Sequence, residues 1–282
     1  VATDNKLHQF LDLSERTEML MSFDSIETVE RLGKLACERR MEANVLLIID
    51  IGFHRLGVPV GEAVSTAIAM ARVRGIRLRG VQIYAGHIYS SASLDEATRI
   101  AHDEIAQAAE VADRIRKAGI EIDIISIGST PSSLIIAERR WTGATELRAG
   151  NYVFMDRQQV RLGIANYDDC ALRVFATVIS KPSRDRILID AGSKTLTSDP
   201  ARPPFTGFGH VVNKRGIELS MLSEEVTTCH LATDADSVSV GELLEIVPNH
   251  ACMMTNLAER IYVGRNGLIE DAWTAQARGK VW

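Results

Sequence analysis

The chain has 282 residues and a net charge of −5, which is enough length for one large α/β domain and a smaller second one. The charge gives no basic footprint for nucleic acid, and no apolar run reaches the ~18 residues of a membrane span. The four cysteines lack the spacing of a disulfide framework, which favours a reducing cytoplasm, and the polar start of the chain predicts no signal peptide.

Residues 1–168 alternate between apolar runs and amphipathic segments. Ser25 is placed to cap a helix, and the continuous apolar run Val45–Asp50 is typical of a strand covered on both faces. The predicted strands are 19–23, 45–50, 81–84, 122–127 and 146–150, and the predicted helices between them are 26–36, 61–74, 94–118 and 133–137. This repetition predicts a parallel sheet with right-handed crossovers. Five such units are visible, whereas a closed parallel barrel needs eight.

Residues 169–282 have a different character, because short apolar runs are separated by turn-forming clusters. Arg265-Asn266-Gly267 predicts a hairpin turn. The predicted strands are 172–180, 186–190, 238–240, 242–247 and 261–263. This part of the chain is therefore predicted to be an antiparallel β domain.

Four predicted strands of the first part end in unusual residues, and active sites of parallel barrels lie at such carboxyl ends. Two glycines flank Arg55 and allow its guanidinium to approach a ligand closely. The small Gly128–Ser132 loop leads toward a helix and offers N–H groups and hydroxyls that suit a phosphate, which the Tyr152 hydroxyl could help to bind. Each motif alone can be an ordinary turn, but their joint placement favours a ligand site. The four segments are 50–58, 84–87, 128–132 and 148–156.

His250 and Cys252 lie two residues apart, just after the predicted strand 242–247. Residues at this spacing fall on the same face of an extended strand, so one imidazole and one thiolate would point at a common spot. Such a pair is the start of a zinc site. The alternative is that both are ordinary packing residues, with Cys252 as a buried apolar thiol.

Eight motifs, spread over essentially the whole chain, occur in a characteristic order. They are Asp50-Ile-Gly-x-x-Arg-x-Gly-Val, Tyr84-x-Gly-His, Gly128-Ser-Thr-Pro, Arg148-Ala-Gly-Asn-Tyr-Val-Phe-Met-Asp, Asp190-Ala-Gly-Ser-Lys, Ser223-Glu-Glu, Pro248-Asn-His-x-Cys and Ala277-Arg-Gly. In this order the chain resembles the D-serine dehydratase and D-threonine aldolase family, pyridoxal-phosphate enzymes of the alanine-racemase fold type. The resemblance implies the C-terminal part of a parallel (β/α)8 barrel over residues 1–168 and a β domain over 169–282 that carries the metal ligands.

The resemblance also implies roles for individual residues. Arg55 would contact the ring oxygen of pyridoxal 5'-phosphate, Tyr84 and His87 would lie near the ring, and Arg55 and His87 would be the catalytic residues of this chain. His250 and Cys252 would bind a divalent metal beside the substrate. The cofactor phosphate would be held by Gly128, Ser129, Thr130, Gly150, Asn151 and Tyr152.

The second metal ligand separates activities within this family, since aldolase-like members tend to show His-x-Asp and dehydratase-like members His-x-Cys. Cys252 therefore favours zinc and the elimination of water from a D-3-hydroxy amino acid, giving a 2-oxo acid and ammonia. D-Threonine aldolase-like cleavage to glycine and an aldehyde is the alternative, and a non-catalytic pyridoxal-phosphate-binding protein is a third. We expect a small D-amino acid as substrate, a homodimer, and no nucleic-acid or membrane partner.

The chain departs from the family in its lysines. The Schiff-base lysine of the family belongs to the first barrel strand, and none of the seven lysines here stands on an apolar strand of the barrel. The five visible units match the later part of the barrel. We therefore expect that three units of ~30 residues each, with the lysine, are missing in front.

Overall fold

The structure, a computed structural model, describes residues 2–280 and divides the chain into two compact units. Unit 1 is Val1–Gly150 and unit 2 is Asn151–Trp282. The boundary predicted from the sequence lies later, at residue 168, whereas in the structure the segment 151–168 belongs to the second unit. Among the described residues, no helix is both long and apolar enough to cross a membrane.

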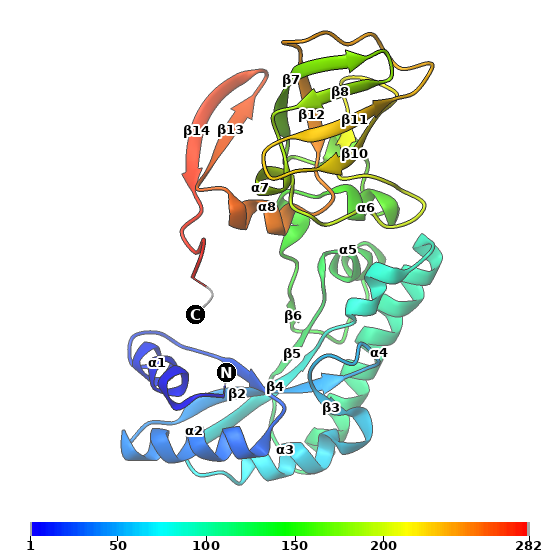
Figure 1. The fold of residues 1–282 in the computed structure, drawn as a ribbon. Coiled ribbons are helices and arrows are strands. Elements are labelled where there is room, and N and C mark those ends of the chain that lie inside the picture. Colours follow the sequence, from blue (N-terminus) through cyan, green and yellow to red (C-terminus); the bar gives the residue numbers. More distant parts are fainter. Residues whose placement is uncertain (1, 281–282) are drawn as a thin grey trace. The chain divides into compact units, whose positions relative to one another are not determined.

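Unit 1 is built on a parallel sheet (Figure 1). The strands, in their order across the sheet, are β1 (Met21–Phe23), β2 (Ala43–Asp50), β4 (Ile76–Ile83), β5 (Ile124–Ile127) and β6 (Glu146–Leu147), and β3 (Val58–Pro59) also pairs with β2. Every pair is parallel, which confirms the predicted sheet. The described residues form an open row from β1 to β6, and closure into an eight-stranded barrel stays a prediction.

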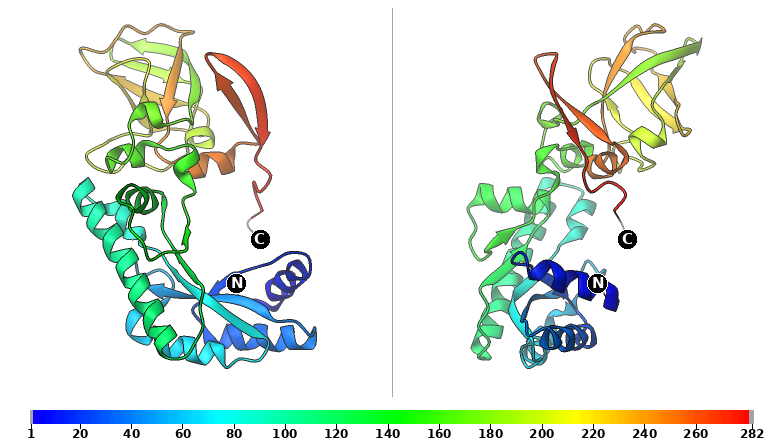
Figure 2. Two further views of the ribbon diagram at one scale, coloured as in Figure 1. Left: turned by 180° about the vertical axis from the view of Figure 1, so that it is seen from behind. Right: turned by 90° about the vertical axis from the view of Figure 1, so that its left-hand side faces the viewer.

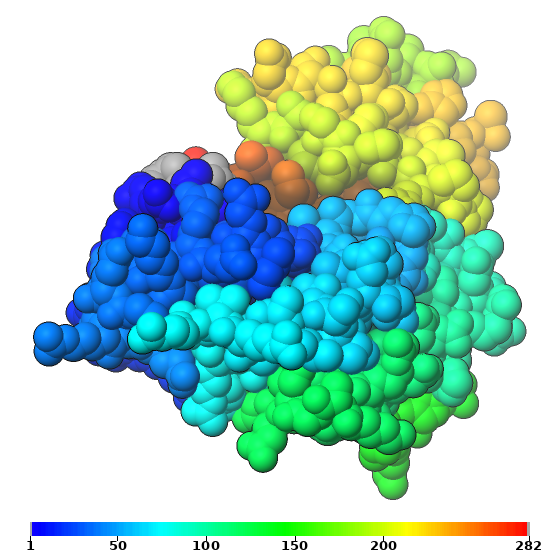
Figure 3. Space-filling view, turned by 90° about the horizontal axis from the view of Figure 1, so that it is seen from below, coloured from blue at the N-terminus to red at the C-terminus, as the bar shows by residue number. Residues whose placement is uncertain are grey.

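The helices of unit 1 are α1 (Asp4–Ser14), α2 (Ile26–Glu38), η1 (Val60–Glu62), α3 (Ala63–Ala71), η2 (Gly86–Ser90), α4 (Leu94–Lys117) and α5 (Thr130–Arg139). Helices α2 to α5 follow their strands in the predicted alternation, whereas α1 precedes the first strand and was not predicted. Ser25 caps α2 by accepting from the Thr28 N–H, and Ser93 caps α4 in the same way. Helices α2, α3 and α4 lie side by side along one face of the sheet (Figure 2), and Figure 3 shows their outer surface.

The core of unit 1 lies between the sheet and these helices. Strand β2 contributes Val45, Leu47 and Ile49, all of which are buried. Helix α4 contributes a face of small and medium apolar side chains, which allows the helix to approach the sheet closely. At Gly80 of β4, a Cβ atom would lie 1.9 Å from the Ile124 carbonyl oxygen of β5, so only glycine fits between these paired strands.

Unit 2 contains a six-stranded antiparallel sheet, as the sequence predicted. Its strands, in their order across the sheet, are β10 (Ile217–Leu222), β11 (Thr227–Leu231), β8 (Arg186–Ile189), β7 (Val174–Ser183), β12 (Leu243–Val247) and β9 (His210–Val211). Strands β13 (Arg260–Arg265) and β14 (Leu268–Thr274) form a separate hairpin around the predicted turn. The short helices are η3 (Asn151–Val153), α6 (Arg157–Arg161), η4 (Tyr167–Asp169), α7 (Ser193–Leu196) and α8 (Ala251–Leu257).

The strand predicted at 238–240 is wrong. This segment is irregular, and Val238 alone turns into the core of unit 2, where its side chain is 2 % exposed. Lys181 donates from Nζ to the Val238 carbonyl oxygen and fixes the segment there. One buried valine between polar neighbours thus produced the alternating pattern that is typical of a strand, although this segment is not part of a sheet.

Candidate functional site

The strand ends of unit 1 bring Arg55 and Tyr84 together. Arg55 follows β2 and Tyr84 follows β4, the next strand in the sheet. The Arg55 guanidinium lies 4.8 Å from the centroid of the Tyr84 ring and 4.9 Å from that of Phe53. The two rings meet edge to face at 5.5 Å. Stacking on both rings holds a positive charge at this end of the sheet, where it can meet an anionic oxygen of a ligand.

His87 lies in η2, three residues after Tyr84. Its side chain is half-buried, and its Nδ1 atom is buried without a hydrogen-bond partner among residues 2–280. Burial of a ring nitrogen without a hydrogen-bond partner costs free energy unless a ligand or a water molecule supplies that partner. His87 is therefore available to a ligand at the same end of the sheet as Tyr84.

The loop after β5 has the geometry of an anion site. Gly128 has φ +106°, and a Cβ there would lie 2.5 Å from the Ser133 Oγ atom, so the position requires glycine. Ser129 caps α5 in a reciprocal capping box with Ser132. Thr130 Oγ1 and Ser133 Oγ are buried at the same helix start and find no partner in the part of the chain that the structure describes. Free hydroxyls at the amino end of a ten-residue helix suit a phosphate.

The Glu104 side chain of α4 is hydrogen-bonded to the segments that follow two of these strands. The sequence motifs did not predict this role. Glu104 Oε1 accepts from the Ala85 N–H at 3.0 Å and from the Gly128 N–H at 3.1 Å. The carboxyl is fully buried, and burial raises its pKa although these hydrogen bonds and the nearby Arg148 lower it. Its signal in the sequence was an acid on the apolar face of α4, beside Ala101, Ile105 and Ala108.

Arg148 supports the same edge from the segment after β6. Its Nη1 donates to Ser126 Oγ of β5 at 2.5 Å, and its Nη2 donates to the Ile83 carbonyl oxygen of β4 at 2.7 Å. The guanidinium therefore ties the carboxyl ends of two strands together. The neighbouring Gly150 is open, because a Cβ there would meet no atom within 4 Å.

Asn151 and Tyr152 belong to η3 of unit 2 and differ in exposure. Asn151 is buried and donates from Nδ2 to Asp156 Oδ2 at 2.7 Å, so one of its amide hydrogens is already used. Tyr152 is 54 % exposed. Of the two predicted cofactor residues in this unit, only Tyr152 presents its side chain to the surface.

His250 and Cys252 meet at the start of α8, and the predicted shared face of a strand is wrong. Strand β12 ends at Val247, His250 is the N-cap of α8, and Cys252 lies in its first turn. His250 Nδ1 lies 3.0 Å from Asp199 Oδ2, and the Cys252 side chain lies close enough to the imidazole to affect its pKa. The nearby Cys252 side chain raises the pKa of His250 to about 9, against the opposite effect of burial, and Asp199 adds to this rise.

This pair has the donor chemistry of a zinc site with open positions. A nitrogen and a sulfur ligand suit zinc, and a carboxylate on the second ring nitrogen is the usual partner of a metal-binding histidine. Within residues 2–280, no cluster of three or more His, Cys, Asp or Glu side chains could hold a metal ion.

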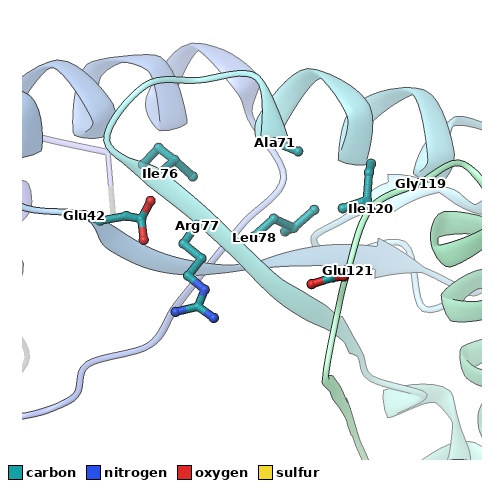
Figure 4. A pocket seen from close by; sticks show the side chains of 8 residues that line it. All are labelled: Glu42, Ala71, Ile76, Arg77, Leu78, Gly119, Ile120 and Glu121. Carbon is teal, nitrogen blue, oxygen red and sulfur yellow. The ribbon is translucent and has the colours of Figure 1, made fainter.

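Unit 1 has a further pocket at the opposite end of its sheet (Figure 4). Its walls come from the start of β2, from β4 and from the turn before β5, and they include Glu42, Arg77 and Glu121. Because this is the amino end of the strands, it is not where a barrel of this class places its chemistry.

Two family models match the chain. The alanine racemase N-terminal domain matches residues 6–158, and the serine dehydratase domain matches residues 171–264. A D-threo-3-hydroxyaspartate dehydratase from Delftia sp. (strain HT23) is 30% identical over 267 residues, which cover 88% of this chain and 70% of that protein. The chain belongs to the D-serine dehydratase and D-threonine aldolase family.

Other members of the family match over most of this chain. A D-threonine aldolase from Arthrobacter sp is 28% identical over 97% of this chain and 71% of its own length. A D-serine dehydratase from Dictyostelium discoideum is 28% identical over 86% of this chain and 67% of its own length. The likeness to alanine racemase extends to the fold, since an alanine racemase from Clostridium difficile 630 superposes with a TM-score of 0.60 at 14% identity over 96% of this chain and 76% of that one.

The solved structure of the Delftia dehydratase superposes with a TM-score of 0.88 at 28% identity, covering 98% of this chain and 77% of that one. Two variants of that enzyme have also been solved. One replaces a histidine by alanine, and the other, described as metal-free, replaces a cysteine two positions later. That spacing is the spacing of His250 and Cys252.

Proposed function

We propose that this chain is a D-serine dehydratase-like lyase that uses pyridoxal 5'-phosphate and zinc to remove water from a D-3-hydroxy amino acid, giving a 2-oxo acid and ammonia. The observation that carries the proposal is the placement of His250 and Cys252 together at the start of α8, with Asp199 on the Nδ1 atom of the histidine. Its wider support is the family, whose named members include dehydratases of D-serine and D-threo-3-hydroxyaspartate.

The cofactor's phosphate would be held at the start of α5. Gly128 gives the turn, Ser129 and Thr130 begin the helix, and the buried hydroxyls of Thr130 and Ser133 supply donors. Pyridoxal phosphate, when bound, acts as an electron sink for the substrate's α-carbon. Gly150, Asn151 and Tyr152 stay proposed cofactor residues on the family's pattern.

Arg55 and His87 are the proposed catalytic residues of unit 1. Arg55 would present its stacked guanidinium to the oxygen of the cofactor ring, which orients that ring. His87, beside Tyr84, has a buried Nδ1 that no group in the described chain satisfies, so it can hold or accept a proton at that atom. None of the lysines of unit 1 stands on a strand, since Lys6, Lys34 and Lys117 lie on helices.

His250 and Cys252 would bind the metal. A zinc ion acts as a Lewis acid and makes a β-hydroxyl a better leaving group. The thiolate of Cys252 favours zinc over the harder Mg²⁺ and Mn²⁺. Asp199 would hold the imidazole in the tautomer whose other nitrogen faces the ion. The Delftia enzyme, solved with alanine in place of a histidine and of a cysteine at this same spacing, supports the choice of His250 and Cys252 as a pair.

Retro-aldol cleavage to glycine and an aldehyde is the second candidate function. The observation that favours it is the D-threonine aldolase from Arthrobacter sp, which matches 97% of this chain. A non-catalytic cofactor-binding protein is the third candidate. The observation that favours it is that the lysines of unit 1 lie on helices and not on its strands. We further propose a homodimer in a reducing cytoplasm, which suits the four free cysteines.

The metal assignment is tested by His250→Ala and Cys252→Ala in the purified protein. Each change removes one of two ligands, so each should remove most of the bound zinc and of the lyase activity while cofactor binding is kept. Elemental analysis gives the zinc content, and the cofactor's absorbance gives its occupancy. Met253→Ala, on the exposed side of the same helix, is the control and should keep its zinc. Undiminished zinc in both ligand variants would contradict the assignment.

A further inference from the structure

One buried carboxylate in unit 2 reaches the peptide between the two proposed metal ligands. Asp156 is fully buried and precedes α6 as its N-cap. Its Oδ1 accepts from the N–H groups of Gln158 at 3.0 Å and Gln159 at 3.2 Å. Its Oδ2 accepts from Asn151 Nδ2 at 2.7 Å and from the Ala251 N–H at 2.9 Å. A single side chain thus serves the starts of two helices that are far apart in the sequence.

The start of α8 needs this help from outside. The side chain of an ordinary N-cap turns back to accept from the first turn of its own helix. Here the N-cap is His250, and its side chain makes no such bond. Asp156 accepts from the first N–H of the helix instead, and the imidazole of His250 is turned toward Asp199.

The residue next to Asp156 fixes the other side of the same loop. The Arg157 N–H donates to the Pro248 carbonyl oxygen at 3.0 Å, and its Nη1 lies 3.3 Å from Asn249 Oδ1. Asn249 is 2 % exposed and donates from Nδ2 to the carbonyl oxygens of Asp199 and Gly207, both at 2.9 Å. The segment 248–251 is therefore held at its backbone on each side of His250.

We propose that Asp156 is a positioning residue for the metal pair: its Oδ2 holds the Ala251 N–H and so sets the spacing at which the His250 imidazole and the Cys252 thiolate meet a zinc ion. The inference rests on the proposed function, because it assigns these two side chains to a metal. It adds a residue outside the His-x-Cys motif on which metal affinity depends. Loss of such outer partners typically costs about 10–100-fold in metal affinity.

Two substitutions separate this role from the capping of α6. Asp156→Asn keeps one oxygen for the Gln158 and Gln159 N–H groups but turns an amide donor against the Ala251 N–H. Asp156→Ser also caps a helix well but is too short to reach Ala251. Thr227→Val is the matched control, since it removes a fully buried hydroxyl in the same unit that donates to the Ala191 carbonyl oxygen and not to the segment 248–251.

The readouts are the Zn²⁺ dissociation constant, measured with Zn²⁺ alone against a chromophoric competitor, and the thiolate-to-metal absorbance band of the Co²⁺-loaded protein. Urea unfolding of each variant reports its stability. We expect zinc affinity to fall at least about tenfold in both Asp156 variants, with a weakened or shifted cobalt band. Thr227→Val should lower the unfolding midpoint but keep the wild-type zinc affinity and cobalt band. Should Asp156→Asn not fold, Asp156→Ser carries the test.

The outcomes separate the inference from the function on which it rests. Wild-type zinc affinity in the folded Asp156 variants overturns the positioning role, and so does an equal loss of affinity in Thr227→Val, because the loss would then follow stability. If the wild-type protein binds neither ion, or if His250→Ala and Cys252→Ala bind both as tightly as wild type, the proposed metal site fails and the positioning role fails with it.

Discussion

Thr130 shows how a single hydroxyl can mark a binding site. It is buried at the start of α5, and its Oγ1 lacks a partner among residues 2–280. An unsatisfied buried hydroxyl costs about 1–3 kcal/mol, whereas a hydrogen bond to a charged group contributes about 1.5–3 kcal/mol. The Thr130 hydroxyl should therefore lower the stability of the cofactor-free protein and raise its affinity for a phosphate.

Thr130→Val should accordingly have opposite effects on binding and on stability. We expect the affinity for pyridoxal 5'-phosphate to fall roughly tenfold or more, because a donor to the phosphate is lost. The free energy of unfolding of the cofactor-free protein should stay the same or rise. Cofactor titration and urea unfolding measure the two quantities. Thr98→Val removes a hydroxyl bonded to the Leu94 carbonyl oxygen on α4 and should leave cofactor affinity unchanged. An unchanged dissociation constant in Thr130→Val would place the phosphate elsewhere.

Local residue types predicted the loop at Gly128 and the His250–Cys252 pair, but not the residues that hold them. A short window of sequence was enough for the loop, but the helix predicted at 133–137 begins earlier, at Thr130, with Ser129 as its N-cap. Asp199 is 51 residues from His250, and Asp156 is 95 residues from Ala251. No local pattern encodes such pairings, because they depend on which loops the β domain brings together.

At the scale of elements, helix α4 covers the sheet and also holds two of its strand ends in place. Glu104, on its buried face, ties the end of β4 to the end of β5 through the N–H groups of Ala85 and Gly128. Burial raises the pKa of this carboxyl above its ordinary value of 4.5. The folded protein therefore keeps the proton to a higher pH than the unfolded chain. The stability that this proton gives is fully present below pH 4.5 and is lost as the pH rises through the folded-state pKa.

Glu104→Gln should remove this pH-dependent loss of stability, while its amide oxygen can still accept from the N–H groups of Ala85 and Gly128. The free energy of unfolding of the variant, relative to wild type, should rise as the pH increases from about 4.5 through the raised pKa of Glu104, because the amide does not ionise. Urea unfolding at a series of pH values measures this difference. Glu110→Gln, on the exposed side of α4, controls for the loss of a carboxylate. Parallel pH profiles for wild type and Glu104→Gln would show that the carboxyl does not titrate in this way.

The elements of unit 1 were predictable because their patterns are long and regular. The strand predicted at 45–50 and the helix predicted at 94–118 correspond to β2 and α4. Strands β10 and β11 were missed, since polar residues such as Glu218 and His230 interrupt their apolar alternation. Helix α8 was missed because it begins at a histidine, which is not an ordinary cap. Its first turn is stabilised by Asp156 instead.

At the scale of the whole molecule, the two units carry different parts of the proposed chemistry. The strand ends of unit 1 present Arg55, Tyr84, His87 and the loop before α5, which suit the cofactor. The loops of unit 2 present His250 and Cys252, which suit a metal ion. The parallel sheet and the β domain followed from the alternation and turn spacing of the sequence. The order of strands in the β domain did not, because antiparallel pairing is decided by contacts between distant segments.

Metal-assisted loss of water from a D-3-hydroxy amino acid is tested most directly by product analysis. The purified protein, loaded with pyridoxal 5'-phosphate and Zn²⁺, would be given D-serine, D-threonine or 3-hydroxy-D-aspartate before and after treatment with a chelator. We predict equal amounts of a 2-oxo acid and ammonia from at least one of these substrates, lost on chelation and restored by Zn²⁺. Release of glycine and an aldehyde, or a rate of 2-oxo acid formation that chelation does not change, would contradict the account.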